Sequence, residues 1–398
     1  MKTKLFGMTL FALTAVAVVL IPMQQSTGAI RPAMIQQTAG LKDKPKVEVV
    51  FVLDTTGSMS GLIAAAKEKI WSIASSLAQA ESAPEIRIGL VAYRDRGDSY
   101  VTRVTALSSD LDSLYATLMD YQASGGGDTP ESVNKALNDA LHEIAWSQDQ
   151  NTYQAVFLVG DAPPHKDYQD ELQYPKILAE ARKRGIVVNA IQAGSARATG
   201  IEWQQIAALG AGEFFQVDQS GSAVAVATPF DEKLASLSKQ LDATRLYYGD
   251  SKTRAEKEEK LAATRKLHES ASVTSRARRA TFNTSDSGEA NLLGDNELVD
   301  DISSGRVDLD SISPEELPAP MQAMAPAVAK DMIRQKAEQR QKLQSEIREL
   351  SLQRGDFLKK KVKEHGGAAA SLDDQIYDAV REQAAAKGFK YETDAPAY

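Results

Sequence analysis

The chain contains no cysteine among its 398 residues. This absence excludes a disulfide framework, a lipid-modified cysteine, thiolate metal sites and thiol catalysis. Positive charge is also in short supply, because 46 basic residues face 54 acidic ones and the formal net charge is −8. The summed field repels polyphosphates and anionic lipid, so we do not expect nucleic acid as a partner.

Long apolar runs are absent from the sequence except near the N-terminus, where 17 residues from Leu5 to Ile21 follow two lysines. Small and polar residues continue to Ala29. This layout predicts a secretory signal peptide over residues 1–29, followed by a linker over residues 30–43. An uncleaved anchor is the alternative, because the apolar run reaches the short limit for a spanning helix. We expect an exported protein of the periplasm or cell envelope, with no membrane span after cleavage.

Apolar, β-rich runs alternate with helical patterns between residues 44 and 220, as they do in βαβ units. The runs "VEVVFVL" and "AVFLV" are almost continuously apolar, which is typical of strands covered on both faces. We therefore predict a doubly wound, mostly parallel α/β sheet with helices on both faces. The expected strands cover residues 47–53, 86–93, 100–106, 153–159, 186–191 and 213–217, and the expected helices begin near Ser60, Ser109, Pro130, Tyr168 and Ile201.

The composition changes after residue 220, and we expect an α-helical C-terminal extension. Helical spacing predicts helices over residues 221–275. Residues 276–325 are rich in Ser, Asp, Pro and Gly, which predicts a linker of low order, with a short docking segment in "LLGDNELVDDISSG" as an alternative for that stretch.

Residues 326–398 are expected to be mainly helical again. They carry an apolar seam that resembles a coiled coil, formed by Leu343, Ile347, Leu350 and Phe357. Charged residues interrupt the seam at Arg340, Arg354 and Lys361. The interruptions favour a helix that packs on a partner, or is partly solvated, over a stable coiled coil.

An acid and several hydroxyls follow the first predicted strand in "VLDTTGSMSG". Asp54 ends the strand, and Thr56 and Ser58 lie on the turn into the next helix. Open parallel sheets bind ligands outside the carboxyl ends of their strands, and oxygen ligands suit a hard cation such as Mg²⁺. The alternative is that Thr56, Ser58 or Ser60 only caps the helix.

Two further stretches are expected at the same edge of the sheet. The Gly-rich stretch "SGGGDTPESVNKAL" brings Thr129 and Glu131 to the start of a helix, and "AVFLVGDAPPH" ends a buried strand at Asp161. Each has a simpler interpretation, with Thr129 as a helix cap before Pro130 and Asp161 as a turn residue. A shared metal site explains all three stretches together.

Residues 44–220 resemble the von Willebrand factor type A domain with its metal-ion-dependent adhesion site. In that family an Asp-x-Ser/Thr-x-Ser motif follows the first strand, a Thr comes from a Gly-rich loop, and an Asp follows the fourth strand. Asp54, Thr56 and Ser58 match the motif, Thr129 matches the loop residue, and Asp161 matches the last acid. "GGGDTPE" also resembles the Asp-Ser-Pro-Glu loop of integrin β-subunit domains, in which the glutamate is a ligand. Glu131 therefore replaces or supplements Thr129.

The resemblance implies metal-dependent protein binding and no enzymatic activity. It places Mg²⁺, or Mn²⁺ or Ca²⁺ in its stead, among these six residues, with one position open to an Asp or Glu carboxylate of a protein partner. The segment over residues 228–250 also looks like the extension that follows this domain in other exported bacterial proteins, whose role is unassigned.

Two enzyme classes are alternatives. "DTTGS" also resembles the Asp-Lys-Thr-Gly-Thr of haloacid-dehalogenase-type transport ATPases, in which Asp54 would be the nucleophile. Thr56, however, stands where phosphatases of that class usually carry a second acid. A serine hydrolase using Ser58 or Ser60 with His165 lacks a G-x-S-x-G elbow, because Met59 occupies its centre.

Two tripeptides match the sequence that integrins recognise, namely Arg96-Gly97-Asp98 and Arg354-Gly355-Asp356. A hairpin turn explains the first and a helix break the second. Because Asp95 and Asp98 follow the second strand, they are candidate rim residues of the site, and His165 is a third.

Overall fold

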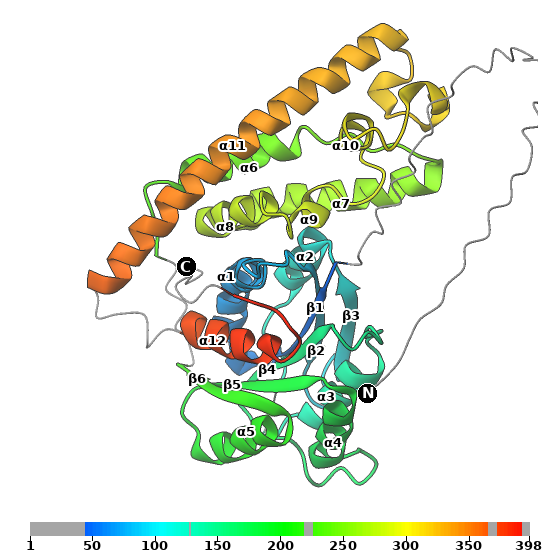
Figure 1. Ribbon diagram of the computed structural model, residues 1–398. Helices are drawn as coiled ribbons and strands as arrows, with labels where there is room; N and C mark the ends of the chain where they lie inside the picture. Colours follow the sequence, from blue (N-terminus) through cyan, green and yellow to red (C-terminus); the bar gives the residue numbers. More distant parts are fainter. Residues whose placement is uncertain (1–43, 127–128, 219–225, 365–371, 392–398) are drawn as a thin grey trace, which may run out of the picture. The chain divides into compact units, whose positions relative to one another are not determined.

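A six-stranded sheet forms the centre of the first half of the chain (Figure 1). The computed structural model describes residues 44–126, 129–218, 226–364 and 372–391, so the predicted signal peptide and linker lie outside it. The strand order is β3-β2-β1-β4-β5-β6, with β3 antiparallel and all other pairs parallel. The strands are β1 (Lys46–Asp54), β2 (Glu85–Tyr93), β3 (Thr102–Ser108), β4 (Tyr153–Gly160), β5 (Val187–Ala193) and β6 (Ala211–Val217). This arrangement confirms the predicted α/β fold.

The register of the central strands determines which residues meet at the carboxyl edge of the sheet. Asp54, the last residue of β1, pairs with Tyr93 of β2, and Leu53 pairs with Val159 of β4. The chain order reverses at β1, because β2 lies on one side of it and β4 on the other. The segments after β1, β2 and β4 therefore begin side by side, where such sheets bind ligands.

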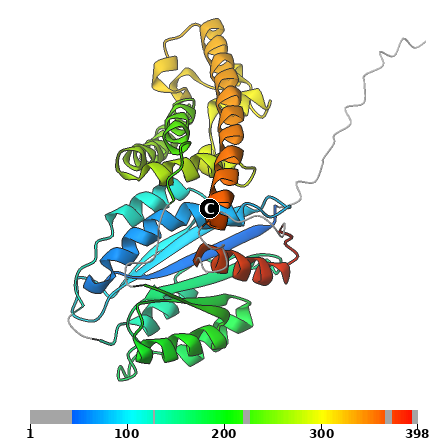
Figure 2. The same cartoon turned by 90° about the vertical axis from the view of Figure 1, so that its left-hand side faces the viewer.

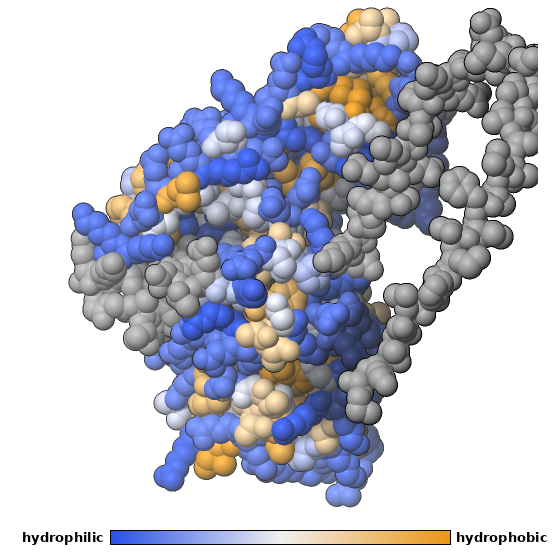
Figure 3. Space-filling view, viewed as in Figure 1, coloured by the Kyte–Doolittle hydropathy of each residue, from blue (hydrophilic) through white to orange (hydrophobic). Residues whose placement is uncertain are grey.

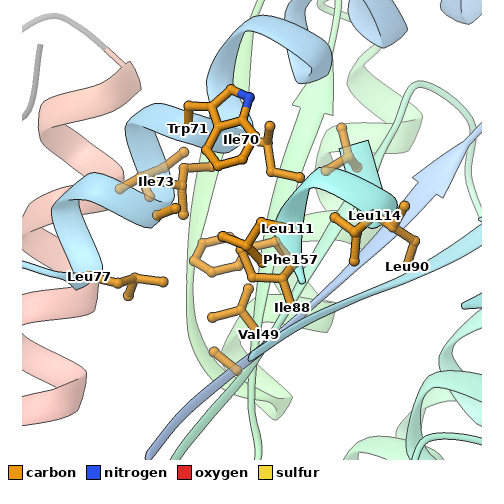
Figure 4. Packing of buried hydrophobic residues seen from close by; sticks show 14 of the residues in the cluster. Val49, Ile70, Trp71, Ile73, Leu77, Ile88, Leu90, Leu111, Leu114 and Phe157 are labelled. Carbon is orange, nitrogen blue, oxygen red and sulfur yellow. The ribbon is translucent and has the colours of Figure 1, made fainter. Parts of the chain in front are cut away.

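Helices cover both faces of the sheet with separate apolar layers. One layer packs α1 and α2 on the sheet, with Trp71, Leu111 and Phe157 among its buried residues (Figure 4). The opposite layer packs α3, α4 and α5 through residues such as Leu137 and Trp203. The bounds are α1 (Ser60–Leu77), preceded by the 3-10 turn η1 (Gly57–Met59), α2 (Leu111–Asp120), α3 (Val133–His142), α4 (Tyr174–Arg184) and α5 (Arg197–Leu209).

Two of these helices begin later than the sequence predicts. The helix α3 begins at Val133 and not near Pro130, so Thr129 is not its cap. The helix α4 begins at Tyr174 and not near Tyr168, because the intervening residues form a loop with contacts of their own, described below.

The extension after the sheet is helical over most of its described length. It contains α6 (Asp231–Asp242), α7 (Ser251–Ser270), α8 (Val273–Asn283), α9 (Glu289–Leu292), α10 (Leu298–Ser303), three 3-10 turns (Leu309–Ser311, Pro314–Glu316 and Ala319–Met321), α11 (Pro326–Glu364) and α12 (Leu372–Ala385). This corrects the prediction of low order for residues 276–325. Polar residues in this segment are buried with partners, as when Asn291 Nδ2 donates to Asn283 Oδ1 at 2.7 Å, so composition alone misjudged them.

The long helix α11 packs against α6, α8 and α10 of the same chain. Arg340 and Arg354, which break the apolar seam in the sequence, are buried here. Arg340 donates to both carboxylate oxygens of Glu297, at 2.7 and 3.0 Å, and Arg354 donates to Asp231 at 2.8 Å. The arginines thus belong to the packed face of α11, and the predicted helix break at Gly355 is wrong, since α11 continues through it.

An apolar groove lies on the surface of the extension, amid residues that are mostly hydrophilic on the face shown in Figure 3. Figure 3 shows hydrophobic residues gathered over α10 and the adjoining part of α11. The groove has a volume of about 460 Å³, and its apolar lining comes from Val299, Ile302, Ile333 and Ala337. Among helices within the described ranges, none combines the length and apolarity needed to cross a bilayer.

The extension shares its core with the sheet domain. Leu267 of α7 and Phe282 of α8 belong to the same buried cluster as Trp71 of α1, and the Trp71 and Phe282 ring centroids lie 6.0 Å apart. The last helix, α12, contacts α1 and β6, and it lies along the same face of the sheet as α1 (Figures 1 and 2). Gln383 of α12 accepts a hydrogen bond from the Tyr153 hydroxyl at 2.7 Å. Residues 44–220 therefore do not form a core separate from the rest.

Candidate metal centre

The carboxylate of Asp54 lies at the end of β1 and is fully buried. Its Oδ1 accepts hydrogen bonds from the Thr56 amide at 2.8 Å and the Thr56 hydroxyl at 2.7 Å. The Thr56 hydroxyl lies 3.3 Å from Ser58 Oγ. Asp54 Oδ2 has no hydrogen-bond partner among the described residues. One oxygen of a buried carboxylate is thus left over, and such a group usually has a partner.

Thr55, which lies between Asp54 and Thr56, fixes the direction of this turn. Its hydroxyl donates to the Tyr93 carbonyl at 2.9 Å and lies 2.6 Å from the Tyr100 hydroxyl, while Arg94 Nε donates to the Thr55 carbonyl at 3.1 Å. Thr55 is therefore tied to β2 and the turn that follows it. Thr56, at the start of the 3-10 turn before α1, makes no side-chain capping bond. Its side chain holds Asp54, so the capping alternative does not describe it.

The Gly-rich loop packs tightly against this turn. Gly57 N donates to the Gly125 carbonyl at 3.0 Å. Gly126 has a φ of +72°, which disfavours any residue with a side chain. A Cβ there would lie 2.9 Å from Thr56 Cβ and 3.3 Å from Glu131 Oε1. Thr56 and Glu131 therefore face the same small space, which only glycine leaves open.

Glu131 is the loop residue that reaches the site. Its backbone amide donates to the Pro163 carbonyl at 3.0 Å, and its carbonyl accepts from the His165 amide at 3.1 Å, which ties it to the segment after β4. The side chain is 3% exposed, and Oε2 has no hydrogen-bond partner in the described part of the chain. Thr129, in contrast, is exposed.

Asp161 follows β4 at the same edge and is half-buried. Its carbonyl accepts a hydrogen bond from Thr199 Oγ1 at 3.1 Å. At the preceding Gly160, a Cβ would lie 3.1 Å from Asp54 Oδ2 and 2.4 Å from the Tyr93 hydroxyl. The structure thus brings Asp54, Thr56, Ser58, Glu131 and Asp161 to one edge, whereas Thr129 forms no hydrogen bond to them within the described residues.

The electrostatics of this edge are those of crowded carboxylates. Burial raises the pKa of Asp54 to about 7, opposed by the Thr56 hydrogen bonds and reinforced by the charge of Asp161. Burial likewise raises the pKa of Glu131 to about 9, and the charge of Asp54 is the next largest cause. Neither carboxylate forms an ion pair within the described residues. A cation at this edge would relieve both effects.

The donor set differs from that of a site built only from acids and histidines. Within the described ranges, no three His, Asp or Glu side chains are grouped so that they could hold a metal ion by themselves. An ion at this edge would therefore take hydroxyl and water oxygens together with one or two carboxylates, which suits Mg²⁺ because it retains several waters.

A stack of three side chains lies beside these residues. The Tyr168 ring packs on the His165 ring, with centroids 3.9 Å apart, and the Arg96 guanidinium lies 4.0 Å above Tyr168 on the other side. The Tyr168 hydroxyl and the Ser132 hydroxyl both donate to the buried Asp95 carboxylate, at 2.8 and 2.6 Å. Asp95 thus joins the segments after β2 and β4 to the start of α3.

Sequence reasoning placed Asp95, Asp98 and His165 at the rim but did not find this network. The acid after β2 was a usable signal, whereas Tyr168 lay in a segment predicted as helix. Both ring nitrogens of His165 face carboxylates, Asp95 at 3.2 Å and Asp167 at 2.7 Å, so His165 has no ring nitrogen directed at Ser58 or Ser60. Arg96 is paired with Asp170 and Glu171, so the first tripeptide is not freely presented.

The strand order and the covering helices define an α/β domain of the doubly wound type. Residues 48–227 match the family model of the von Willebrand factor A domain. Residues 48–227 are therefore a von Willebrand factor A domain, which makes up less than half of the chain.

Similar proteins match a part of the chain. An ariadne-like RING finger protein of Acanthamoeba polyphaga mimivirus is 34% identical over 119 residues, which are 30% of this chain and 11% of that protein. The von Willebrand factor A domain-containing protein 7 of Mus musculus is 36% identical over 120 residues, or 30% of this chain and 12% of that protein. The chain thus spans only about a tenth of the length of these relatives.

Solved structures of the same fold match more weakly. The VWA domain of SpRpn10 is 13% identical with a TM-score of 0.35, and the match covers 45% of this chain and 94% of that one. The proximal thread matrix protein 1 of the mussel byssus, solved with a zinc-occupied MIDAS motif, is 16% identical with a TM-score of 0.36, covering 45% and 43%.

Proposed function

We propose that the protein binds a protein partner through a divalent cation, Mg²⁺ or a similar ion, held at the carboxyl edge of the sheet. Two buried carboxylates with one unpartnered oxygen each, Asp54 and Glu131, are the observation that carries this proposal. Burying a carboxylate without a partner is costly, and a cation supplies what the described side chains do not.

The ion would take the hydroxyls of Thr56 and Ser58, the carboxylate of Asp54 and one further carboxylate, from Glu131 or, directly or through water, Asp161. Hydroxyl ligands are neutral, so an ion held by one or two carboxylates keeps positive charge and attracts an anion. When bound, the ion supplies an open coordination position for an Asp or Glu carboxylate of the partner. We assign Glu131 and not Thr129 to the loop position, because Glu131 is buried beside Thr56 and Thr129 is exposed.

The signal-like N-terminus supports a place for this activity outside the cytoplasm, in the periplasm or cell envelope. The haloacid-dehalogenase alternative gains nothing from the family match. The Thr56 side chain, which occupies the position of that class's second acid, donates a hydrogen bond to Asp54 and is not an acid.

The experiment is metal-dependent capture of partners from an envelope extract by the full-length protein. We expect capture with Mg²⁺, loss of capture with chelator, and loss with Asp54→Ala. Asp356→Ala, which removes an exposed carboxylate on α11, is the matched control and retains capture. A captured partner then loses binding, by about 2–5 kcal/mol, when one particular Asp or Glu of its own becomes Ala.

A phosphatase assay distinguishes binder from enzyme. We expect no metal-dependent phosphate release. Release that disappears with Asp54→Asn would replace this proposal with the phosphoryl-transfer alternative.

A further inference from the structure

A second pocket lies at the opposite edge of the sheet, where β4 and β5 begin. Its volume is about 550 Å³. The lining comes from the loop of residues 146–151 before β4, from Gln154 of β4, from the end of α4 with Gly185, and from residues 386–387 after α12. Parallel strands separate this pocket from the candidate metal centre, which lies beyond the other end of β4.

The lining of this pocket is basic in a chain that is acidic overall. Arg182, Lys183, Arg184 and Lys387 line it against one acid, Asp149, so four positive side chains face one negative one. The formal net charge of the whole chain is −8. The pocket is therefore locally positive, although the protein as a whole is negatively charged.

Most of this positive charge is not neutralised by the protein. Arg182 and Lys183 form no ion pair within the described residues. Lys387 Nζ donates to the Gln150 carbonyl at 3.1 Å, and Arg184 Nη1 donates to the Leu141 carbonyl at 2.7 Å and lies 4.0 Å from Glu180. Carbonyl groups satisfy hydrogen bonds but leave the charge in place, so the pocket remains open to an anion.

Helix energetics explain only part of this cluster. Arg182, Lys183 and Arg184 occupy the last turn of α4, where basic residues interact favourably with the helix dipole. The dipole of α4 does not explain Lys387, which comes from beyond a different helix. The dipole also does not explain why the basic side chains line the same pocket as the exposed amide of Asn151.

We propose that this pocket binds a small multivalent anion, one that carries two or more carboxylate or phosphate groups. Guanidinium and ammonium groups from two separate elements suit two anionic groups on one ligand, and the amide side chains supply further hydrogen bonds. The proposal is independent of the metal centre.

The position of Lys387 couples ligand binding to the docking of α12. This residue follows α12, whose Ala384 is buried in the core of the sheet domain. A ligand that bridges Lys387 and the α4 turn binds only when α12 is docked, so it stabilises the docked state. Ligand binding should slow hydrogen exchange in α12.

Calorimetric titration of the full-length protein with citrate and with pyrophosphate, at constant ionic strength, tests the proposal. Both probes chelate metals, so the titrations use metal-free protein and are repeated with Asp54→Ala, which retains this binding. We expect saturable binding of at least one probe, about tenfold or more weaker after Arg182→Glu with Lys183→Glu. Tighter binding of citrate or of pyrophosphate tells which anionic group the pocket prefers.

The control is Lys359→Glu with Lys360→Glu, which makes the same change in net charge at exposed positions of α11. We expect this control to bind like the wild type and to show the same slowing of exchange in α12. Absence of saturable binding, or equal weakening in both double variants, would overturn the proposal.

Discussion

Arg279 of α8 and Asp112 of α2 form a two-pronged ion pair, and both side chains are fully buried. Arg279 Nε donates to one Asp112 oxygen at 2.6 Å, and Nη2 donates to the other at 2.5 Å. Burial alone would raise the pKa of Asp112, but the guanidinium outweighs it and holds the pKa below its usual range. The helical extension is thus joined to the sheet domain through a charge pair that water does not reach.

Replacing Arg279 with Ala should therefore destabilise the whole protein. The substitution leaves Asp112 and Asp242 buried without their shared cation, and breaking a buried pair costs about 3–5 kcal/mol. Urea denaturation measures the change. Arg265→Ala is the control, because Arg265 pairs with Glu258 at the surface, where a pair contributes about 0–1 kcal/mol. Equal urea midpoints for the two variants would contradict the claim that the buried pair of Arg279 and Asp112 joins the extension to the sheet domain.

The docking of α12 gives a second prediction with a matched pair of variants. Ala384 is 0% exposed, whereas the adjacent Ala385 is exposed. Ala384→Asp buries a carboxylate without a partner, which costs several kcal/mol, so α12 should detach and hydrogen exchange should quicken in α12 and α1. Ala385→Asp should leave exchange unchanged. If both variants exchange like the wild type, α12 is not part of the core.

The raised pKa values of Asp54 and Glu131 predict how stability depends on pH. Their ordinary values of 3.8 and 4.5 rise to about 7 and about 9 in the fold. Between these limits the native state holds more protons than the unfolded state, so metal-free protein should lose stability as pH rises from about 4 to about 9. Stabilisation by Mg²⁺ should grow over the same range, since the ion competes with those protons.

Melting temperatures measured across this range, with chelator and then with Mg²⁺, check the prediction. Asp54→Asn with Glu131→Gln removes both titrations and should flatten the slope. A slope that persists unchanged in the double variant would assign the pH dependence to other groups.

The assignment of Glu131, and not Thr129, as the loop ligand of the ion gives a further prediction. Glu131→Gln should weaken Mg²⁺ binding by about tenfold or more, because it removes a buried charge beside the ion. Thr129→Ala should change the affinity little, because Thr129 is exposed. Titration of each variant with Mg²⁺ compares them. If Thr129→Ala weakens Mg²⁺ binding more than Glu131→Gln does, Thr129 is the ligand.

The fold could be predicted because its signals are local. Strands such as β1 and β4 are apolar runs that end in an acid, and their parallel order brings Asp54 and Asp161 to one edge. The hydroxyls of Thr56 and Ser58 follow β1 directly, so spacing was sufficient to find them. The Asp95 network was not predictable in this way, because Ser132, His165 and Tyr168 meet Asp95 only after the sheet has formed.

The extension shows where composition misleads. Arg340 and Arg354 interrupt an apolar seam in the sequence, and Arg279 lies in the segment predicted to have low order. Each is nevertheless buried against a carboxylate that lies far away along the chain. A charge interrupts an apolar pattern whether it faces water or a buried partner. Sequence reasoning therefore assigned low order to residues 276–325 and a broken seam to α11.

Calorimetric titration of Mn²⁺ and Mg²⁺ into chelator-treated, full-length protein tests the central claim most directly. We predict saturable binding of one ion per chain, loss of binding in Asp54→Ala and retention in Asp356→Ala. The bound ion should also raise stability, by about 2.7 kcal/mol at a hundredfold excess over Kd. Folded wild-type protein that binds neither ion, or an Asp54→Ala variant that binds as well as the wild type, would contradict the account.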